Sequence, residues 1–287
     1  MKLATFCHKK ENKIAKVIGK SLFPLSEITQ DIPNDMRKLI NHWDDYVKKI
    51  NTFKLDESKK IKLKDVKLCA PIVGPKKIFA IGLNYSDHII EMAIDKPKQQ
   101  LWFSKQINTI NGPFDVVKIP SVSSKTDYEV ELVAIIGRLG KHIKLDEAHK
   151  YVFGYCIGND VSVRDWQMKT SQWMLGKSFD THAPLGPFIT TSDEIGDPHR
   201  LGIRSFVNGE MRQNSNTRHL IFNIWQQISY LSKVVTLEPG DLIFTGTPGG
   251  VGYAMDPPKY IKDGDIVSCE IDEIGKIENL FKNEDLK

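Results

Sequence analysis

Hydrophobic and polar positions divide the chain into an amphipathic first part and a longer second part with strand-like runs. In the first part, the pattern predicts an early hairpin over residues 1–20 and then a helix over residues 35–50, whose apolar positions are Met36, Leu39, Trp43, Tyr46, Val47 and Ile50. From residue 71 onward, the extended runs are KIFAIGLN, VELVAIIG, FGYCIGND, LGPFITT, IRSFVNGEMRQ, GDLIFTGTP and GDIVSCEID. These patterns predict an α+β protein in which strands dominate.

Turn and helix signals lie between these runs. The pair Asn208–Gly209 predicts a two-residue hairpin turn, and Pro239–Gly240 and Asp263–Gly264 predict further turns. One helix is expected to begin near Asp146, and another lies where apolar residues repeat at three and four positions, namely Ile221, Ile224, Ile228 and Leu231.

Charge separates the same two parts. Residues 1–70 contain 16 Lys and Arg against 9 Asp and Glu, whereas residues 71–287 contain 24 against 27. We therefore expect a small basic N-terminal domain over residues 1–70 and a catalytic domain over residues 71–287, with the boundary near Pro71. The lysines are scattered and no aromatic platform accompanies them, so no nucleic-acid partner is expected.

Composition narrows the class and location of the protein. The chain has 287 residues, of which 40% are hydrophobic, enough for a sizeable globular core. No apolar run reaches the roughly 18 residues of a membrane span, and no secretory signal is present, so we expect a cytoplasmic protein with no membrane partner. The four cysteines are widely spaced, which argues against a disulfide framework or a zinc knuckle.

Three carboxylates share one face of a predicted strand in KTDYEVELVAIIG. Asp127, Glu129 and Glu131 alternate along this segment, and the apolar run that follows is typical of a strand buried on both faces. A buried carboxylate needs a partner, so a shared metal ion is favoured over an exposed edge strand. An EF-hand is excluded, because Leu132 and Arg138 stand where that loop needs Gly and Glu.

Two further segments carry candidate chemistry. In GYCIGNDVSVRDWQ, an apolar strand leads into Asp160, which is a further metal ligand or else a turn residue. In NYSDHIIEM, His88 and Glu91 are three residues apart, so one helical turn places them side by side as a proton-transfer pair or a surface ion pair. The chain lacks GxSxG, HExxH and the GK[ST] ending of a phosphate loop.

Six segments together resemble the fumarylacetoacetate hydrolase family, in the same order and over about residues 71–287. They are KIFAIGLNYSDHIIEM, DYEVELVAIIG, GYCIGNDVSVRDWQ, QWMLGKSFDTHAPLGPFI, VNGEMRQNSNT and LEPGDLIFTGTPGGVG. The resemblance implies a mixed β-roll for the catalytic domain, usually assembled as a homodimer. It also implies a Mg²⁺ or Mn²⁺ site formed by Glu129, Glu131 and Asp160, with a turn or supporting role for Asp127.

The resemblance implies roles for six more side chains. His88 and Glu91 match the family's catalytic pair on a segment that closes over the ligand, and Lys177 matches a lysine that stabilises a developing oxyanion. The expected substrate-binding residues are Arg164, Gln167 and Thr247.

Family substrates are 2-oxo acids or β-dicarbonyl acids, which react through a metal-bound enolate. We expect hydrolysis of a C–C bond, as in fumarylacetoacetate and acylpyruvate hydrolases. The alternatives are an oxaloacetate keto–enol tautomerase, a decarboxylase or a hydroxymuconate-type isomerase, and, in a different class, a catalytically silent binding or scaffold protein. The segments VRDWQM and QWMLGKSFDT favour the subgroup with oxaloacetate tautomerases. Fumarylacetoacetate itself is not expected as substrate, because Asn84 stands where larger fumarylacetoacetases have an additional metal-binding Asp.

Overall fold

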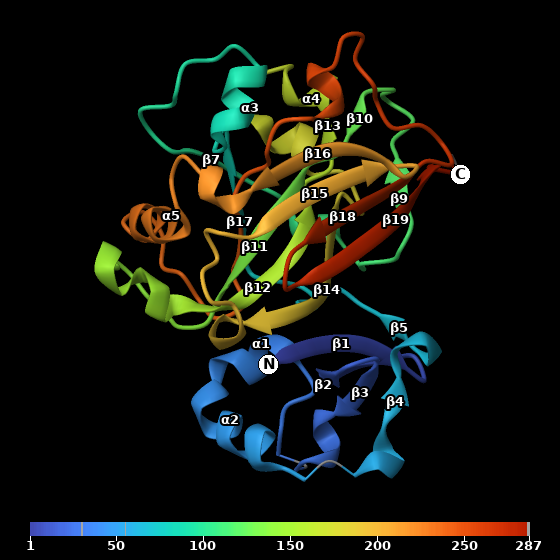
Figure 1. The fold of residues 1–287 in the computed structure, drawn as a ribbon, viewed down its shortest axis with the longest axis vertical. Coiled ribbons are helices and arrows are strands. Elements are labelled where there is room, and N and C mark those ends of the chain that lie inside the picture. Colours follow the sequence, from blue (N-terminus) through green and yellow to red (C-terminus); the bar gives the residue numbers. More distant parts are fainter. Residues whose placement is uncertain (30, 55, 286–287) are drawn as a thin grey trace.

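The computed structural model describes residues 1–29, 31–54 and 56–285 and shows the strand-rich α+β fold that the sequence predicts (Figure 1). Within these ranges, the larger sheet has 12 strands, in the order β4-β3-β2-β1-β14-β12-β11-β17-β6-β7, with β5 beside β1 and β8 beside β14. Its strands are β1 (Lys2–His8), β2 (Glu11–Ile18), β3 (Ser21–Pro24), β4 (Ile61–Lys62), β5 (Lys67–Leu68), β6 (Ile78–Gly82), β7 (Leu101–Ser104), β8 (Ile110–Asn111), β11 (Val130–Ile136), β12 (Val152–Asn159), β14 (Ala183–Thr191) and β17 (Leu242–Phe244).

A second sheet has five strands in the order β16-β15-β18-β19-β9, and a short pair is formed by β10 and β13. Their bounds are β9 (Val117–Ile119), β10 (Thr126–Asp127), β13 (Ser162–Val163), β15 (Gly202–Val207), β16 (Glu210–Asn216), β18 (Ile266–Ile271) and β19 (Gly275–Asn283). The predicted turn at Asn208–Gly209 joins β15 to β16, and both residues have the positive φ angles, 52° and 81°, of a two-residue hairpin turn. Figure 1 shows the five-stranded sheet lying across β11 and β12.

The N-terminal residues form the expected hairpin, but the helix predicted over residues 35–50 is two helices. They are α1 (Met36–Asn41) and α2 (Trp43–Thr52), and His42 separates them with φ of −117° and ψ of 28°, outside the helical region. Strand β1 pairs with β2 along its length and also with β14, through Lys2↔Thr190. Since residues 1–70 extend the large sheet in this way, their division from residues 71–287 as a folding unit stays a prediction.

The other helices are short. They are α3 (Ser86–Glu91), α4 (Arg164–Gln167) and α5 (Ile224–Leu231). The helix expected near Asp146 is a 3₁₀ helix, η5 (Leu145–Tyr151), and a second 3₁₀ helix, η6 (Trp173–Lys177), leads toward β14. Helix α5 begins later than the apolar repeat suggested, because Asn223 caps it reciprocally with Gln226. No helix in the described ranges has the length and apolar content needed to cross a membrane.

Strand β11 is buried on both faces, as its apolar run predicted. Leu132 and Ala134 belong to the core shared with the five-stranded sheet and α5, whereas Val133 and Ile135 belong to the core shared with the N-terminal strands and helices. Glu129 and Glu131 lie at the beginning of this strand and are therefore taken out of water with it. The exposed edge strand considered from the sequence is wrong for this segment.

Candidate active site

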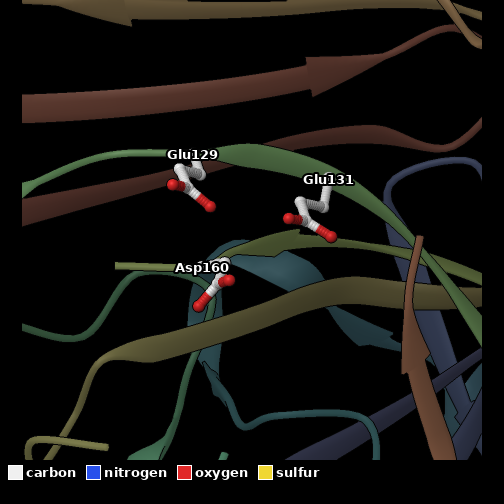
Figure 2. A group of neighbouring side chains, drawn as sticks. All are labelled: Glu129, Glu131 and Asp160. Carbon is white, nitrogen blue, oxygen red and sulfur yellow. The ribbon is translucent and has the colours of Figure 1, made fainter. Parts of the chain in front are cut away.

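Three buried carboxylates converge at one end of β11 and β12 (Figure 2). Glu129 precedes β11, Glu131 lies within it, and Asp160 directly follows β12. The two strands are antiparallel neighbours, so the start of β11 meets the end of β12, and the Asp160 N–H donates to the Glu129 carbonyl oxygen at 2.8 Å. One ligand oxygen from each side chain lies within 4.8 Å of the others. The structure thus brings together the three predicted metal ligands.

Positive side chains neutralise two of these carboxylates. The Lys177 ammonium lies 2.6 Å from Glu129 Oε2 and 2.7 Å from Asp160 Oδ2. Lys105, which sequence reasoning missed, donates to Asp160 Oδ1 at 2.6 Å. Glu131 receives a hydrogen bond from the Gly246 N–H at 2.7 Å, and no Lys or Arg among the described residues forms an ion pair with it.

The pKa values of the two glutamates move in opposite directions for this reason. Burial disfavours the ionised form of Glu129, but the charges of Lys177 and Arg164 outweigh it and lower the pKa of Glu129 to about 2. Burial, followed by the negative charges of Asp160 and Glu129, raises the pKa of Glu131 well above its usual range. Glu131 is therefore the carboxylate of the three that has no cationic partner within the described part of the chain.

Arg164 is enclosed among protein acceptors at the same site. Its Nε donates to Asp127 Oδ2 at 2.8 Å, and Nη1 donates to Glu129 Oε1 at 2.6 Å and to Gln167 Oε1 at 3.0 Å. Asp127 also accepts hydrogen bonds from the backbone N–H groups of Gly252 and Tyr253, both at 2.9 Å. Asp127 thus contacts both Arg164 and the backbone of the loop at Gly252 and Tyr253, and its supporting role stays a prediction.

His88 and Glu91 lie side by side on α3, as their spacing predicted. Nδ1 of His88 is 3.4 Å from Glu91 Oε2, and both Glu91 carboxylate oxygens accept from the Gly250 N–H at 3.0 Å. A carboxylate can only accept when ionised, so we assign the His88 proton to Nδ1, which leaves Nε2 free to accept. The loop of Gly250 thereby holds the pair in place.

Thr247 lies on the same loop but its hydroxyl is already engaged. It donates to the Val130 carbonyl oxygen at 3.0 Å and accepts from Gln213 Nε2 at 2.7 Å. Gln213 in turn accepts from the Val130 N–H at 3.0 Å. Thr247 and Gln213 therefore fix the loop against β11, and Gln213 is a second residue that sequence reasoning missed.

These side chains line one pocket of about 130 Å³, which is small beside the roughly 300–1,000 Å³ of pockets for drug-sized ligands. Its polar side includes His88, both glutamates, Arg164, Gln167, Lys177 and Thr247. Seven of the nine predicted site residues thus line a single cavity. The other two contact residues of its lining, since Glu91 lies beside His88 and Asp160 is paired with Lys177.

Comparison with known proteins decides the family. Residues 77–282 match the model of the fumarylacetoacetate (FAA) hydrolase C-terminal family. The chain belongs to the fumarylacetoacetate hydrolase family. Fumarylacetoacetate hydrolase domain-containing protein 2 homolog from Dictyostelium discoideum is 44% identical over 94% of this chain and 92% of that one. A mitochondrial oxaloacetate tautomerase from Xenopus laevis is 44% identical over 91% of this chain and 82% of its own.

Solved structures of the fumarylacetoacetate hydrolase family share the whole fold. A fumarylacetoacetate hydrolase from Exiguobacterium antarcticum has a TM-score of 0.87 and 33% identity, covering 99% of this chain and 100% of that one. Maleylpyruvate hydrolase from Sphingobium sp. SYK-6, in complex with manganese(II) and pyruvate, has a TM-score of 0.84 and 30% identity at the same coverage. The expected family and fold are confirmed.

The residues of this fumarylacetoacetate hydrolase family member fit a divalent metal ion. Three carboxylates offer oxygen ligands only, which suits Mg²⁺ or Mn²⁺. Glu131 is a buried acid that forms no ion pair with a cationic side chain in residues 1–29, 31–54 and 56–285, and a metal ion at this point would compensate the charge of its ionised form.

Asn84, which stands where the larger fumarylacetoacetases have an additional metal-binding Asp, forms hydrogen bonds with the backbone. Its amide nitrogen donates to the carbonyl oxygens of Phe222 and Thr245 at 3.0 and 2.8 Å, and its oxygen accepts from the Phe222 N–H at 2.9 Å. This buried side chain is fully used in joining the α3 segment to the residues before α5.

Proposed function

We propose that the protein is a keto–enol tautomerase of oxaloacetate that requires Mg²⁺ or Mn²⁺. The observation that carries the proposal is that one small pocket is lined by His88, which is paired with Glu91, and by Glu129 and Glu131 of the carboxylate trio, with the Lys177 ammonium beside them. Relatives named oxaloacetate tautomerase, at 44–47% identity, support this reaction over the others in the family.

Tautomerisation needs a base at carbon and positive charge at oxygen. Nε2 of His88 would take a proton from C3 of the keto form, while Glu91 holds the imidazole and stabilises its positive charge. For enol formation, the protonated His88 would then deliver this proton to the C2 oxygen, and in the reverse direction it would take the proton from that oxygen and place it on C3. No water is consumed and no C–C bond breaks. A bound divalent ion would supply positive charge to the keto and carboxylate oxygens.

Lys177 would supply a second positive charge beside the developing oxyanion. Burial alone lowers the pKa of its ammonium, but the carboxylates of Asp160 and Glu129 outweigh burial and raise it, so the charge is kept. Arg164 and Gln167 share a hydrogen bond, and their outer edges would orient the substrate carboxylate.

Hydrolysis of an acylpyruvate is the second candidate. It rests on the likeness to maleylpyruvate hydrolase, which covers 99% of this chain. The same His88 nitrogen would then activate a water molecule instead of removing a substrate proton. Decarboxylation, a hydroxymuconate-type isomerisation and a silent scaffold are the remaining alternatives.

Assembly, domain division and location are further parts of the proposal. We infer a homodimer, as the family resemblance implies, and we propose residues 1–70 as a small N-terminal domain because of the basic charge of this segment. The cytoplasmic location expected from the sequence stands beside relatives whose names place them in mitochondria. Sedimentation of the purified protein tests the homodimer, and microscopy of the tagged full chain tests the location.

The deciding assay offers enol-oxaloacetate to Mg²⁺- or Mn²⁺-loaded protein and records loss of the enol and release of pyruvate separately. We expect enol loss above the buffer rate without pyruvate, abolished by a chelator and restored by the metal. Oxalate, which resembles the planar chelating edge of the enol, should inhibit competitively. Pyruvate release in step with enol loss would indicate a decarboxylase, and cleavage of acylpyruvates alone would indicate a hydrolase. Turnover of none of these compounds would leave the hydroxymuconate-type isomerase and the silent scaffold as the candidates.

A further inference from the structure

The pocket has an apolar side opposite its charged groups. The side chains there include Met92, Ile94, Phe103, Met168, Trp173 and Tyr253. Among them, Ile94, Met168 and Tyr253 are exposed and form the open edge, whereas Phe103 and Trp173 are half-buried and form an inner wall. A substrate can therefore extend toward the open edge, whereas the inner wall limits its length on the other side.

Trp173 lies directly on the backbone of β6. A Cβ atom placed on Gly82 would be 2.3 Å from Cζ3 of the Trp173 indole, much closer than carbon atoms approach in proteins. The Phe103 ring packs against the same indole, with ring centroids 5.6 Å apart, and the Lys177 ammonium lies 5.1 Å from the Phe103 centroid. The wall thus runs from Lys177 through two aromatic rings to the backbone of Gly82.

The helix that carries the indole is itself fixed in place. Trp173 and Lys177 are the first and last residues of η6. Between them, Gly176 meets α4 so closely that a Cβ atom would lie 2.2 Å from the Gln167 nitrogen. Since Lys177 is held by Glu129 and Asp160, η6 cannot shift as a unit away from the pocket without moving a charged group out of its ion pairs.

We propose that Trp173 is a specificity-determining residue that limits the length of the 2-oxo acid, with Gly82 as the position that admits it. The inference rests on the proposed 2-oxo acid function and adds the size of substrate that the site accepts. Short acids fit between the carboxylates and the indole, whereas a longer alkyl chain on the side of C3 meets the ring. One additional methylene that does not fit typically costs about 10–200-fold in discrimination.

The test measures binding and does not depend on turnover. Isothermal titration of straight-chain 2-oxo acids, from 2-oxobutanoate to 2-oxooctanoate, into Mn²⁺-loaded wild type should give a Kd that rises with chain length. In Trp173→Ala, the ratio of the Kd of 2-oxooctanoate to that of 2-oxobutanoate should fall by at least about tenfold. Trp173→Phe, which keeps an aromatic wall, should give an intermediate ratio and guards against misfolding of the alanine variant.

Trp225→Ala is the matched control, because this half-buried tryptophan contacts His149 and His199 away from the pocket. In Trp225→Ala, the ratio of the Kd of 2-oxooctanoate to that of 2-oxobutanoate should equal the wild-type ratio. An unchanged ratio in both Trp173 variants would overturn the proposal, and it would mean that the chain leaves through the open edge at Ile94 and Met168.

The proposed tautomerase activity and the proposed limit on substrate length can be refuted independently of each other. A protein that shows no tautomerase activity but binds 2-oxo acids with the Trp173-dependent profile refutes the reaction and keeps the size limit. Normal tautomerase activity with a chain-length profile that ignores Trp173 refutes the size limit alone. Absence of 2-oxo acid binding in wild type and all variants overturns both.

Discussion

The ammonium of Lys105 lies 2.6 Å from Oδ1 of Asp160, and both side chains are fully enclosed. Lys177 contacts the other oxygen of the same carboxylate, so Asp160 has a cationic partner on each side. Burial lowers the pKa of the Lys105 ammonium, and the charge of Asp160 acts in the opposite direction. Lys105 therefore anchors the end of β7 to the candidate metal site.

Replacing Lys105 by Met should destabilise the metal-free protein. Leaving a buried charge uncompensated typically costs about 3–5 kcal/mol, and because Lys177 still contacts Asp160 in this variant, the loss should be at most that amount. Urea unfolding of the two proteins measures the difference. Lys150→Met is the control, because Lys150 pairs with Glu147 on the surface and such pairs contribute about 0–1 kcal/mol. Equal losses in the two variants would show that Lys105 has no special role.

Glu131→Ala should weaken Mn²⁺ binding by more than about 100-fold, because even the loss of an outer partner of a metal ligand typically costs about 10–100-fold. Isothermal titration of Mn²⁺ into the metal-free proteins measures this change. Glu147→Ala, at a half-buried position on η5 away from the pocket, should bind like wild type. Wild-type affinity in Glu131→Ala would remove this residue from the metal site.

His88→Ala should keep the metal ion and lose about 10²–10⁴-fold in kcat, since a positioned base typically contributes this much. Glu91→Gln should lose less in kcat than His88→Ala. The Gln amide can still accept a hydrogen bond from Nδ1 of His88, but it carries no charge to stabilise the imidazolium. Steady-state rates on oxaloacetate, with Mn²⁺ affinity measured in parallel, separate the two effects. A metal-replete His88→Ala variant with near-normal kcat would exclude His88 as the base.

His182 should make the protein less stable as the pH falls. Burial lowers the pKa of His182 to about 3 from its ordinary value of 6.5, although the Lys118 carbonyl oxygen acts against this. Between these two values the unfolded chain binds a proton that the folded protein does not. The free energy of unfolding therefore falls by about 1.4 kcal/mol per pH unit as the pH drops below 6.5 toward 3.

The measurement for this prediction is the slope of unfolding free energy against pH, obtained from urea unfolding between about pH 7 and about pH 5. His182→Gln keeps a donor for the Lys118 carbonyl oxygen but does not titrate, so its slope should be smaller than that of wild type, by a difference that grows toward the amount above as the pH falls below 6.5. His42→Gln, at an exposed position, should follow the wild-type curve. Identical slopes in all three proteins would contradict the prediction.

Local patterns predicted the parts of this site that depend on neighbouring residues in the chain. Alternation put Glu129 and Glu131 on one face of a strand, and the apolar run after them predicted burial on both faces. The three-residue spacing of His88 and Glu91 predicted their contact on α3. These relationships follow from the periods of a strand and a helix, which one short segment determines.

Apolar spacing did not predict where a helix is interrupted or whether a helix is of the α or the 3₁₀ form. The apolar spacing across residues 35–50 continues through His42, yet the helix is broken there, and the segment near Asp146 forms a 3₁₀ helix. Periodicity shows which side of a segment faces the core, but the two helical forms and a one-residue break keep nearly the same sides buried.

The ion pairs of the site were decided only by the tertiary structure. Lys105 is 55 residues from Asp160, and Gln213 is 83 residues from Val130, so neither contact has a spacing that could predict it. A lone lysine after an apolar run is normally a surface residue. Its burial here depends on the carboxylate that the end of β12 presents to it, because an ammonium leaves water at acceptable cost only where a distant part of the fold supplies the opposite charge.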